Sequence, residues 1–294
     1  MSEPIKVLLD TDIGTDIDDA VALAYLLCQP RCDLLGITTC TGEADKRAEM
    51  ASAICRNVGR GDIPVHVGCT QAMLIDIPQK IAHQAPALRD WDRQRDFPAN
   101  TAVDFLRKTI RANPGQVTLL TIGPLTNIGV LFALDPEIPS LLKQFVLMCG
   151  RFFEGMGGEW NAYNDPHATA IAYGNGCQSR PARHISYGLD VTTKCQMPAD
   201  EARRRFTAKA LKPVSDFAEI WFKERPQITF HDPLAAACIF APDICEYRPG
   251  KVTVPVEGPT AGWTLFKGES EGPHQAACKV DSQRFFQHYF EIVK

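Results

Sequence analysis

The chain has 294 residues, 45% of them apolar, which is enough to bury a substantial core, and we expect residues 1–294 to form one domain. Its 31 basic and 35 acidic residues give a formal charge of −4, which offers no electrostatic case for binding nucleic acid. The N-terminus lacks the pattern of a secretory signal, and no run of about 18 uncharged apolar residues occurs, so we expect a cytoplasmic protein without a membrane segment. The eleven cysteines include no CxxC pair and indicate neither a disulfide framework nor a zinc site.

Apolar runs and amphipathic segments alternate along the chain. The run at 5–9 predicts a buried strand, Gly14 interrupts it, and a helix is predicted directly after the acidic residues that follow. Further strands are predicted at 31–40, 63–68, 116–123, 145–150, 182–192, 251–258 and 262–268. Further helices are predicted within 41–59, 100–115, 124–134, 200–225, 231–240 and 280–293, and after Asp165. This alternation predicts an α/β fold with an open, mostly parallel sheet and helices on both faces.

The segment from Cys69 to Asn100 shows no sustained period, which is unusually long for a connection in a compact domain. Such a segment often serves as a lid over a site. It contains His83, a candidate acid, and a polar run at 89–96 that we expect to lie on the solvated surface.

Five carboxylates lie between the first strand and the first helix: Asp10, Asp12, Asp16, Asp18 and Asp19. They repel one another unless a cation lies among them, and calcium or magnesium prefers such oxygen ligands. In an open parallel sheet this loop lies at the carboxyl ends of the strands, where ligands collect.

Three other interpretations of this loop have to be compared with a cation site. A helix cap explains one or two carboxylates, not five. An EF-hand fails because, counted from Asp10, the glycine is fifth and Val21 is twelfth. A haloacid-dehalogenase-like phosphatase, with Asp10 as nucleophile and Asp12 as acid and base, stays open.

Two Asp-Pro pairs, Asp165–Pro166 and Asp232–Pro233, each precede an apolar helix. Both are typical of an N-cap followed by a proline in the first turn. The cap accounts for Asp165 but leaves Glu159 and Asn161 unexplained. Taken alone, the pair His231–Asp232 is more typical of a helix cap than of a site.

Four separated motifs resemble the inosine-uridine-preferring nucleoside hydrolases, in the order of that family. They are DTDIGTDIDDA at 10–20, TIGPLTNIG at 121–129, FVLMCG with EWNAYNDPHATA within 145–170, and HDPLAAA at 231–237. The resemblance implies a Rossmann-like open sheet, a calcium ion at its C-terminal edge, and hydrolysis of the N-glycosidic bond of ribonucleosides to ribose and free base in nucleoside salvage. It also implies a homo-oligomer, a dimer or tetramer.

The resemblance further implies a role for individual residues. Asp18 would be the general base that activates a water held by the ion, through an oxocarbenium-like state. His231 would help the base to depart. The implied calcium ligands are Asp12, Asp19, Asp232 and the carbonyl of Ile122. The implied substrate contacts are Asp18, Glu159, Asn161, His231, Glu43 and Trp160, and Trp263 is a further aromatic candidate.

Three departures from the family pattern bear on the substrate. Residues 15–17 separate Gly14 from the acidic pair Asp18–Asp19, where the family's commonest sequence motif has a single residue. Glu43 stands where many members have Asn, and Met156 or Gly157 falls where an Asn for the 5′-hydroxyl is expected. The preference for purine or pyrimidine, the role of Asp16 and the leaving-group acid stay open. So do two other functions, the phosphatase and a nucleoside- or ribose-binding protein without turnover.

Overall fold

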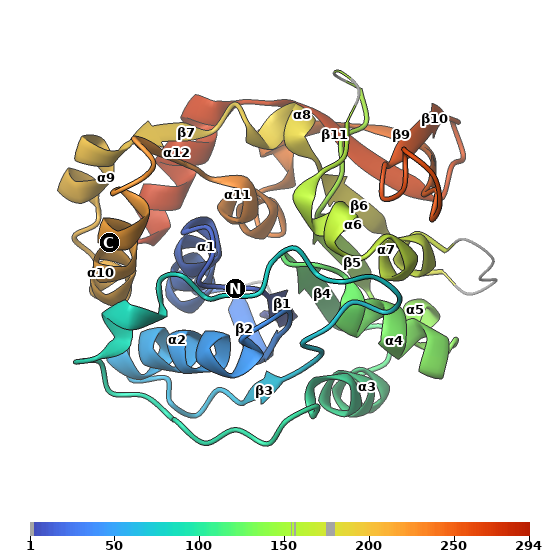
Figure 1. The fold of residues 1–294 in the computed structure, drawn as a ribbon. Coiled ribbons are helices and arrows are strands. Elements are labelled where there is room, and N and C mark those ends of the chain that lie inside the picture. Colours follow the sequence, from blue (N-terminus) through green and yellow to red (C-terminus); the bar gives the residue numbers. More distant parts are fainter. Residues whose placement is uncertain (1–2, 154, 156, 175–179) are drawn as a thin grey trace.

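The computed structural model describes residues 3–153, 155, 157–174 and 180–294 (Figure 1). Its main sheet has nine strands in the order β10-β9-β11-β6-β5-β4-β1-β2-β3. These strands are β1 (Ile5–Thr11), β2 (Cys32–Thr39), β3 (Val65–Val67), β4 (Val117–Thr121), β5 (Gln144–Met148), β6 (His184–Tyr187), β9 (Cys245–Thr253), β10 (Leu265–Gly268) and β11 (His274–Val280). All neighbours from β3 to β11 pair in parallel, and only β9 and β10 add antiparallel pairs at one edge. The prediction of a mostly parallel α/β sheet is confirmed.

Helices cover both faces of this sheet (Figure 1). They are α1 (Asp18–Cys28), α2 (Ala44–Asn57), α3 (Ala102–Ala112), α4 (Thr126–Leu134), α5 (Ile138–Leu141), α6 (Trp160–Asn164), α7 (Pro166–Ala172), α8 (Leu189–Thr192), α9 (Ala199–Arg205), α10 (Lys212–Trp221), α11 (His231–Cys238) and α12 (Ser282–Ile292). Side chains along β1 pack alternately on the two faces of the sheet, because successive side chains of a strand point to opposite sides. Val7 and Leu9 join the core cluster that includes α1, α11 and α12, whereas Leu8 joins the cluster with α3 and α4.

The predicted strand at 182–192 is only partly right. Strand β6 ends at Tyr187 and the short helix α8 follows. The chain turns at Gly188, where an added Cβ would lie 2.6 Å from the carbonyl oxygen of Gly150. The Asp190 side chain then accepts hydrogen bonds from the backbone N–H groups of Phe152 and Phe153. Tertiary contacts therefore end this strand early.

The C-terminal third differs most from the prediction. The strand expected at 251–258 begins at Cys245 and ends at Thr253. Strand β11 was not predicted, nor was the separate antiparallel pair of β7 (Gln196–Pro198) and β8 (Gln227–Thr229).

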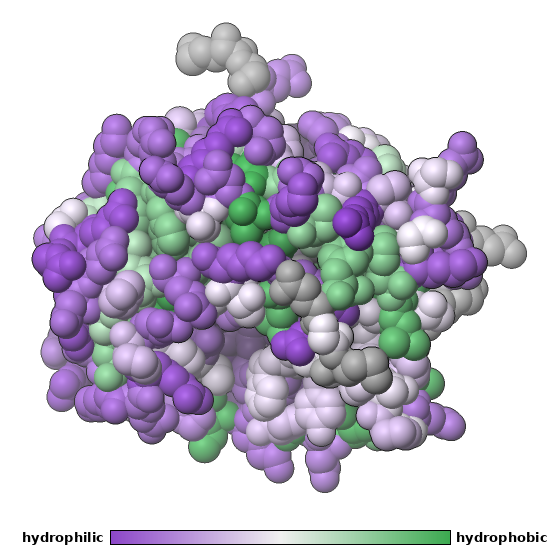
Figure 2. All heavy atoms as spheres, turned by 90° about the horizontal axis from the view of Figure 1, so that it is seen from above, coloured by the Kyte–Doolittle hydropathy of each residue, from purple (hydrophilic) through white to green (hydrophobic). Residues whose placement is uncertain are grey.

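No helix in the described ranges is long and apolar enough to cross a membrane. Seen from above, hydrophilic side chains surround a face on which hydrophobic ones gather toward the middle (Figure 2).

The segment 69–100 contains one short 3-10 helix, Ala85–Leu88, and is otherwise irregular in the structure, as expected. It is nevertheless fixed to the first loop, because the backbone N–H of Gln84 donates to the carbonyl of Gly14 at 3.0 Å.

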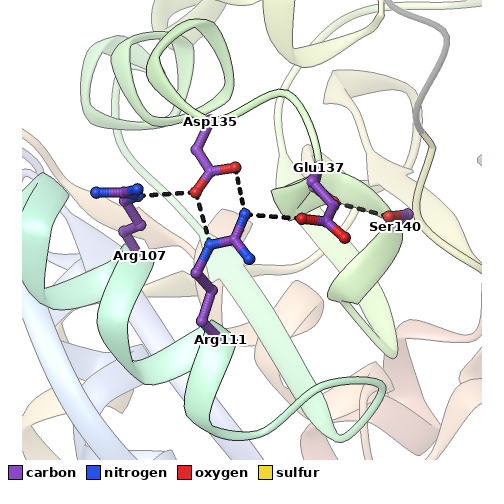
Figure 3. Close-up of polar contacts among 5 residues, drawn as sticks. All are labelled: Arg107, Arg111, Asp135, Glu137 and Ser140. Carbon is purple, nitrogen blue, oxygen red and sulfur yellow. Dashed lines mark hydrogen bonds and ion pairs between the residues drawn. The ribbon is translucent and has the colours of Figure 1, made fainter.

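A cluster of ion pairs connects α3 to the segment that follows α4. Arg107 and Arg111 of α3 bind Asp135 at 2.7 Å each, and Arg111 also binds Glu137 (Figure 3).

Candidate active site

The first turns of α1 and α11 bring three carboxylates together. Asp18 and Asp19 begin α1, Asp232 lies in the first turn of α11, and one oxygen of each lies within 4.8 Å of the others. All three residues are at most 4% exposed. The positive ends of two helix dipoles point at this cluster and favour its negative charge.

Burial raises the pKa of Asp18, Asp19 and Asp232 well above the usual range for a carboxyl. Repulsion among the acids raises it further: Asp16 and Asp19 act on Asp18, and Asp18 and Asp19 act on Asp232. Buried carboxylates stay ionised at little cost only when a cation neutralises them. An all-oxygen donor set of this kind fits a hard divalent cation such as calcium.

The cluster lies in a cavity of about 380 Å³. The resemblance implies a catalytic, ion-binding or substrate-binding role for ten residues, and nine of them line this cavity: Asp12, Asp18, Asp19, Ile122, Glu159, Trp160, Asn161, His231 and Asp232. Asp16 lines it as well. The structure thus brings together segments that the sequence separates by more than 200 residues.

Asp12 and Ile122 are held by neighbouring side chains. The amide nitrogen of Gln79 donates to Asp12 Oδ2, and Gln79 in turn accepts a hydrogen bond from the indole of Trp160. Asn161 Nδ2 donates to the carbonyl of Ile122 at 2.9 Å. A carbonyl has two lone pairs, so this contact orients the Ile122 oxygen and leaves it able to bind a cation.

Glu159, which the sequence left unexplained, is the N-cap of α6. Its carboxylate accepts hydrogen bonds from the backbone N–H groups of Asn161 at 2.8 Å, Ala162 at 3.1 Å and Gly150 at 3.0 Å. These contacts hold the carboxylate rigidly at the cavity wall. Met156, the other residue considered on this segment, lies outside the described residues.

The two Asp-Pro pairs differ. Asp165 caps α7 as predicted, accepting from the N–H of Ala168 at 3.0 Å, and Pro166 is the first helical residue. Asp232 does not cap α11, which begins one residue earlier at His231. The cap interpretation of His231–Asp232 is therefore wrong.

His231 lines the cavity with its ring partly fixed. Its Nδ1 lies 2.7 Å from the hydroxyl oxygen of Thr192, and either atom can donate. Burial lowers the pKa of His231 to about 4, so the imidazole is neutral near pH 7.

Glu43 does not line the cavity, and its assignment as a substrate contact stays a prediction. Its carboxylate is 2.5 Å from the ammonium of Lys46 and accepts from the N–H of Ala82 at 3.1 Å. The Lys46 hydrogen bond lowers the pKa of Glu43. Glu43 and His83 line a separate neighbouring cavity, and Trp263 is absent from the lining of the acidic one.

Asp10, the nucleophile of the phosphatase interpretation, lies outside the cavity lining. It is fully buried, and its Oδ1 accepts from Asn127 at 2.7 Å and from Thr38. Burial raises its pKa to about 7. A side chain so placed cannot attack a substrate in the cavity.

Several residues around the site were missed in the sequence. Gln79, Trp221 and Arg225 line the cavity, and Arg47 is buried beneath the first loop. Gln79 comes from the aperiodic segment and Arg225 from a turn after α10, so neither carried a signal. Arg47 did carry one, since it shares the buried face of α2 with small apolar residues.

A buried cluster of carboxylates in a small cavity at the carboxyl ends of parallel strands is typical of an enzyme pocket for a small polar molecule. The family model for inosine-uridine preferring nucleoside hydrolases matches residues 7–287, and the chain belongs to that family. The family is metal-dependent and hydrolyses N-glycosyl bonds, which settles the choice against a phosphatase and a binding protein without turnover.

Individual relatives agree with this assignment. The chain is 28% identical to uridine nucleosidase 1 of Arabidopsis thaliana, over 88% of this chain and 81% of that protein. It is 30% identical to the pyrimidine-specific ribonucleoside hydrolase RihA of Citrobacter koseri, over 82% of this chain and 80% of that protein. A purine-preferring ribonucleoside hydrolase from Gardnerella vaginalis superposes with a TM-score of 0.85 at 26% identity, covering 98% of both chains.

Proposed function

We propose that this chain is a calcium-dependent ribonucleoside hydrolase that releases ribose and a free base. The observation that carries the proposal is the buried cluster of Asp18, Asp19 and Asp232 in a cavity that polar and aromatic side chains also line, among them Glu159, Asn161, Trp160 and His231. Asp12, Asp19, Asp232 and the Ile122 carbonyl would hold the ion. When bound, calcium supplies positive charge that orients a water molecule and two sugar hydroxyls and acidifies the water.

Asp18 is the proposed general base. Its Oδ2 accepts a hydrogen bond from the backbone N–H of Asp232 at 3.0 Å, which fixes the carboxylate and leaves Oδ1 to take a proton from the attacking water. A carboxylate in such a buried place is a stronger base than one in water, because burial disfavours its charged form.

Glu159 and Asn161 are the proposed ribose contacts. The three N–H groups bound to Glu159 leave lone pairs that can accept a hydroxyl hydrogen. Asn161 donates its amide hydrogens to the carbonyls of Ile122 and Met148. Its side-chain oxygen is therefore the atom that could accept a hydrogen bond from a sugar hydroxyl. Both side chains would help to stabilise the oxocarbenium-like state through the sugar hydroxyls.

The base end of the pocket has His231, Trp160, Trp221 and Arg225. If the Thr192 hydroxyl donates to His231 Nδ1, the neutral ring keeps its hydrogen on Nε2 and can donate it to the departing base. The aromatic rings offer stacking surfaces and Arg225 offers a cation for carbonyl oxygens of the base. Relatives named for uridine, pyrimidine and purine nucleosides occur at similar identity, so we propose ribonucleosides as the class and leave the base open.

The test is a panel of inosine, adenosine, uridine, cytidine and their 2′-deoxy forms, assayed for reducing sugar and free base. We expect ribonucleosides to be cleaved at least about tenfold faster than deoxyribonucleosides, because the ion and Asp18 would hold the 2′-hydroxyl. Verified removal of calcium with a chelator should abolish turnover, and added calcium should restore it. Equal rates on ribo and deoxy forms, or full activity without calcium, would refute the proposed mechanism.

A further inference from the structure

Arg47 is a buried cation that the proposed chemistry does not use. It lies on α2, it is 0% exposed, and it is among the largest fully buried side chains. An arginine keeps its charge at all ordinary pH values, so this position contains a permanent positive charge inside the protein.

The guanidinium of Arg47 connects segments that meet below the acidic cavity. Its Nε donates to the carbonyl of Thr41 at 2.8 Å. Its Nη1 donates to the carbonyls of Asp12 and Ile13, the latter at 3.0 Å, and to the hydroxyl of Thr15 at 3.0 Å. One side chain thereby fixes the turn after β2 and the loop after β1.

The segment 69–100 joins the same arrangement. The Thr15 hydroxyl donates to the carbonyl of Ile81 at 3.3 Å, and Arg47 Nη2 lies 3.5 Å from that carbonyl oxygen. Thr15 is one of the three residues, 15–17, that stand where the commonest family sequence has a single residue. The lengthened loop and Arg47 therefore form one hydrogen-bonded unit.

Among the residues that the structure describes, Arg47 has no ion-pair partner. Every hydrogen-bond acceptor found for it within the described ranges is a backbone carbonyl or a hydroxyl. Its charge nevertheless acts on the cluster: burial raises the pKa of Asp12 and Asp19, and the charge of Arg47 opposes that rise. Two effects on calcium binding follow, since a fixed cation repels the ion while a fixed loop presents its ligands.

We propose that Arg47 is a positioning residue that fixes the loop 12–15, and with it Asp12, in the conformation that receives the cation. The inference rests on the proposed calcium site. We expect positioning to outweigh repulsion because the guanidinium donates to the carbonyls of Asp12 and Ile13 and to the Thr15 hydroxyl, which holds the loop in one conformation.

The experiment compares Arg47→Lys, which keeps the charge but loses the planar fork, with Arg47→Met, which loses both. Arg56→Met is the matched control, because Arg56 lies on the same helix and forms an exposed ion pair with Asp92. Two measurements are made on protein freed of calcium: amide hydrogen exchange in residues 12–17 and calcium affinity by titration. We expect faster exchange and calcium binding weaker by about tenfold or more in both Arg47 variants, and no change in the control.

Turnover at saturating calcium separates positioning from general damage. We expect kcat of Arg47→Lys to recover to within about threefold of wild type once calcium saturates, since Arg47 does not line the cavity. Wild-type exchange and affinity in Arg47→Lys would overturn the proposal, as would tighter calcium binding in Arg47→Met. If Arg47→Met does not fold, Arg47→Lys decides. A wild-type protein that binds no calcium would refute the proposed function instead, and the exchange comparison would still test Arg47.

Discussion

Two Asp-Pro pairs that look alike in the sequence do different things in the fold. The Asp165 carboxylate is satisfied by three donors: the N–H groups of Ala168 at 3.0 Å and Met73 at 2.9 Å, and the hydroxyl of Thr126 at 2.8 Å. The Asp232 carboxylate has no hydrogen-bond donor among the described residues and faces Asp18 and Asp19 instead. The difference separates a carboxylate that holds the fold together from one that is available to a ligand.

The helix starts explain the difference. Helix α7 begins at Pro166, so Asp165 precedes it and can reach back to an N–H of the first turn. Helix α11 begins at His231, so Asp232 is already inside the first turn, and one of its carboxylate oxygens lies within 4.8 Å of oxygens of Asp18 and Asp19. A shift of one or two residues in the start of a helix therefore changes a cap into a site residue.

The largest expected effect comes from Asp232→Ala. Removing one of three clustered carboxylates should abolish stoichiometric calcium binding and lower turnover by at least about a thousandfold. Metal analysis of the purified variant and a reducing-sugar assay check both. The control is Asp165→Ala, which should keep its calcium. Full calcium occupancy in Asp232→Ala would remove this residue from the ligand set.

Asp18→Asn should have the next largest effect. The amide keeps the shape and the contact with the Asp232 N–H but cannot take a proton, so kcat should fall by about a hundredfold to ten-thousandfold. Calcium should stay bound, because Asp12, Asp19, Asp232 and Ile122 are unchanged. Turnover within about tenfold of wild type would show that another group is the base.

Asp165→Ala should lower the stability of the fold and leave the catalytic activity nearly unchanged. It leaves the Met73 and Ala168 N–H groups and the Thr126 hydroxyl without their acceptor, and we expect a loss of about 2–4 kcal/mol in the free energy of unfolding. Urea unfolding measures the loss, and activity per folded molecule should stay within about threefold of wild type. A stable variant with no activity would place Asp165 in the site.

Sequence periodicity predicted the parallel sheet well because its strands are apolar runs bounded by glycine and polar turns. Strand β11 was not predicted because its sequence, HQAACKV, has one β-branched residue and no strict alternation of apolar and polar residues. Its register comes from pairing with β6 and β9. Strands β7 and β8 have three residues each, too few to show a period.

The acidic part of the site was predictable because five carboxylates in ten residues repel one another unless a cation lies among them. The remaining groups meet only through tertiary structure. Gln79 reaches Asp12 from an aperiodic segment, and Glu159, in addition to capping α6, accepts a hydrogen bond from the N–H of Gly150 in the turn after β5. Glu43 lies outside the cavity, and its carboxylate pairs with Lys46 one helical turn away.

The smallest expected effect is on stability, from substitution of a third acid, Asp135. Its carboxylate forms ion pairs with Arg111 and Arg107 (Figure 3). Hydrogen bonds from these arginines hold the pKa of Asp135 well below its usual value, opposite to the effect of burial on Asp232. A carboxyl whose pKa is lowered on folding stabilises the protein above its unfolded pKa of about 4, and this contribution is lost as the pH falls toward its folded pKa. Asp135→Asn should therefore reduce stability by about 1 kcal/mol at pH 7, with the gap to wild type shrinking below about pH 4. Unfolding of both proteins from pH 7 to pH 3 tests this; a gap that is constant or grows in acid would contradict the assigned role of the arginine pairs.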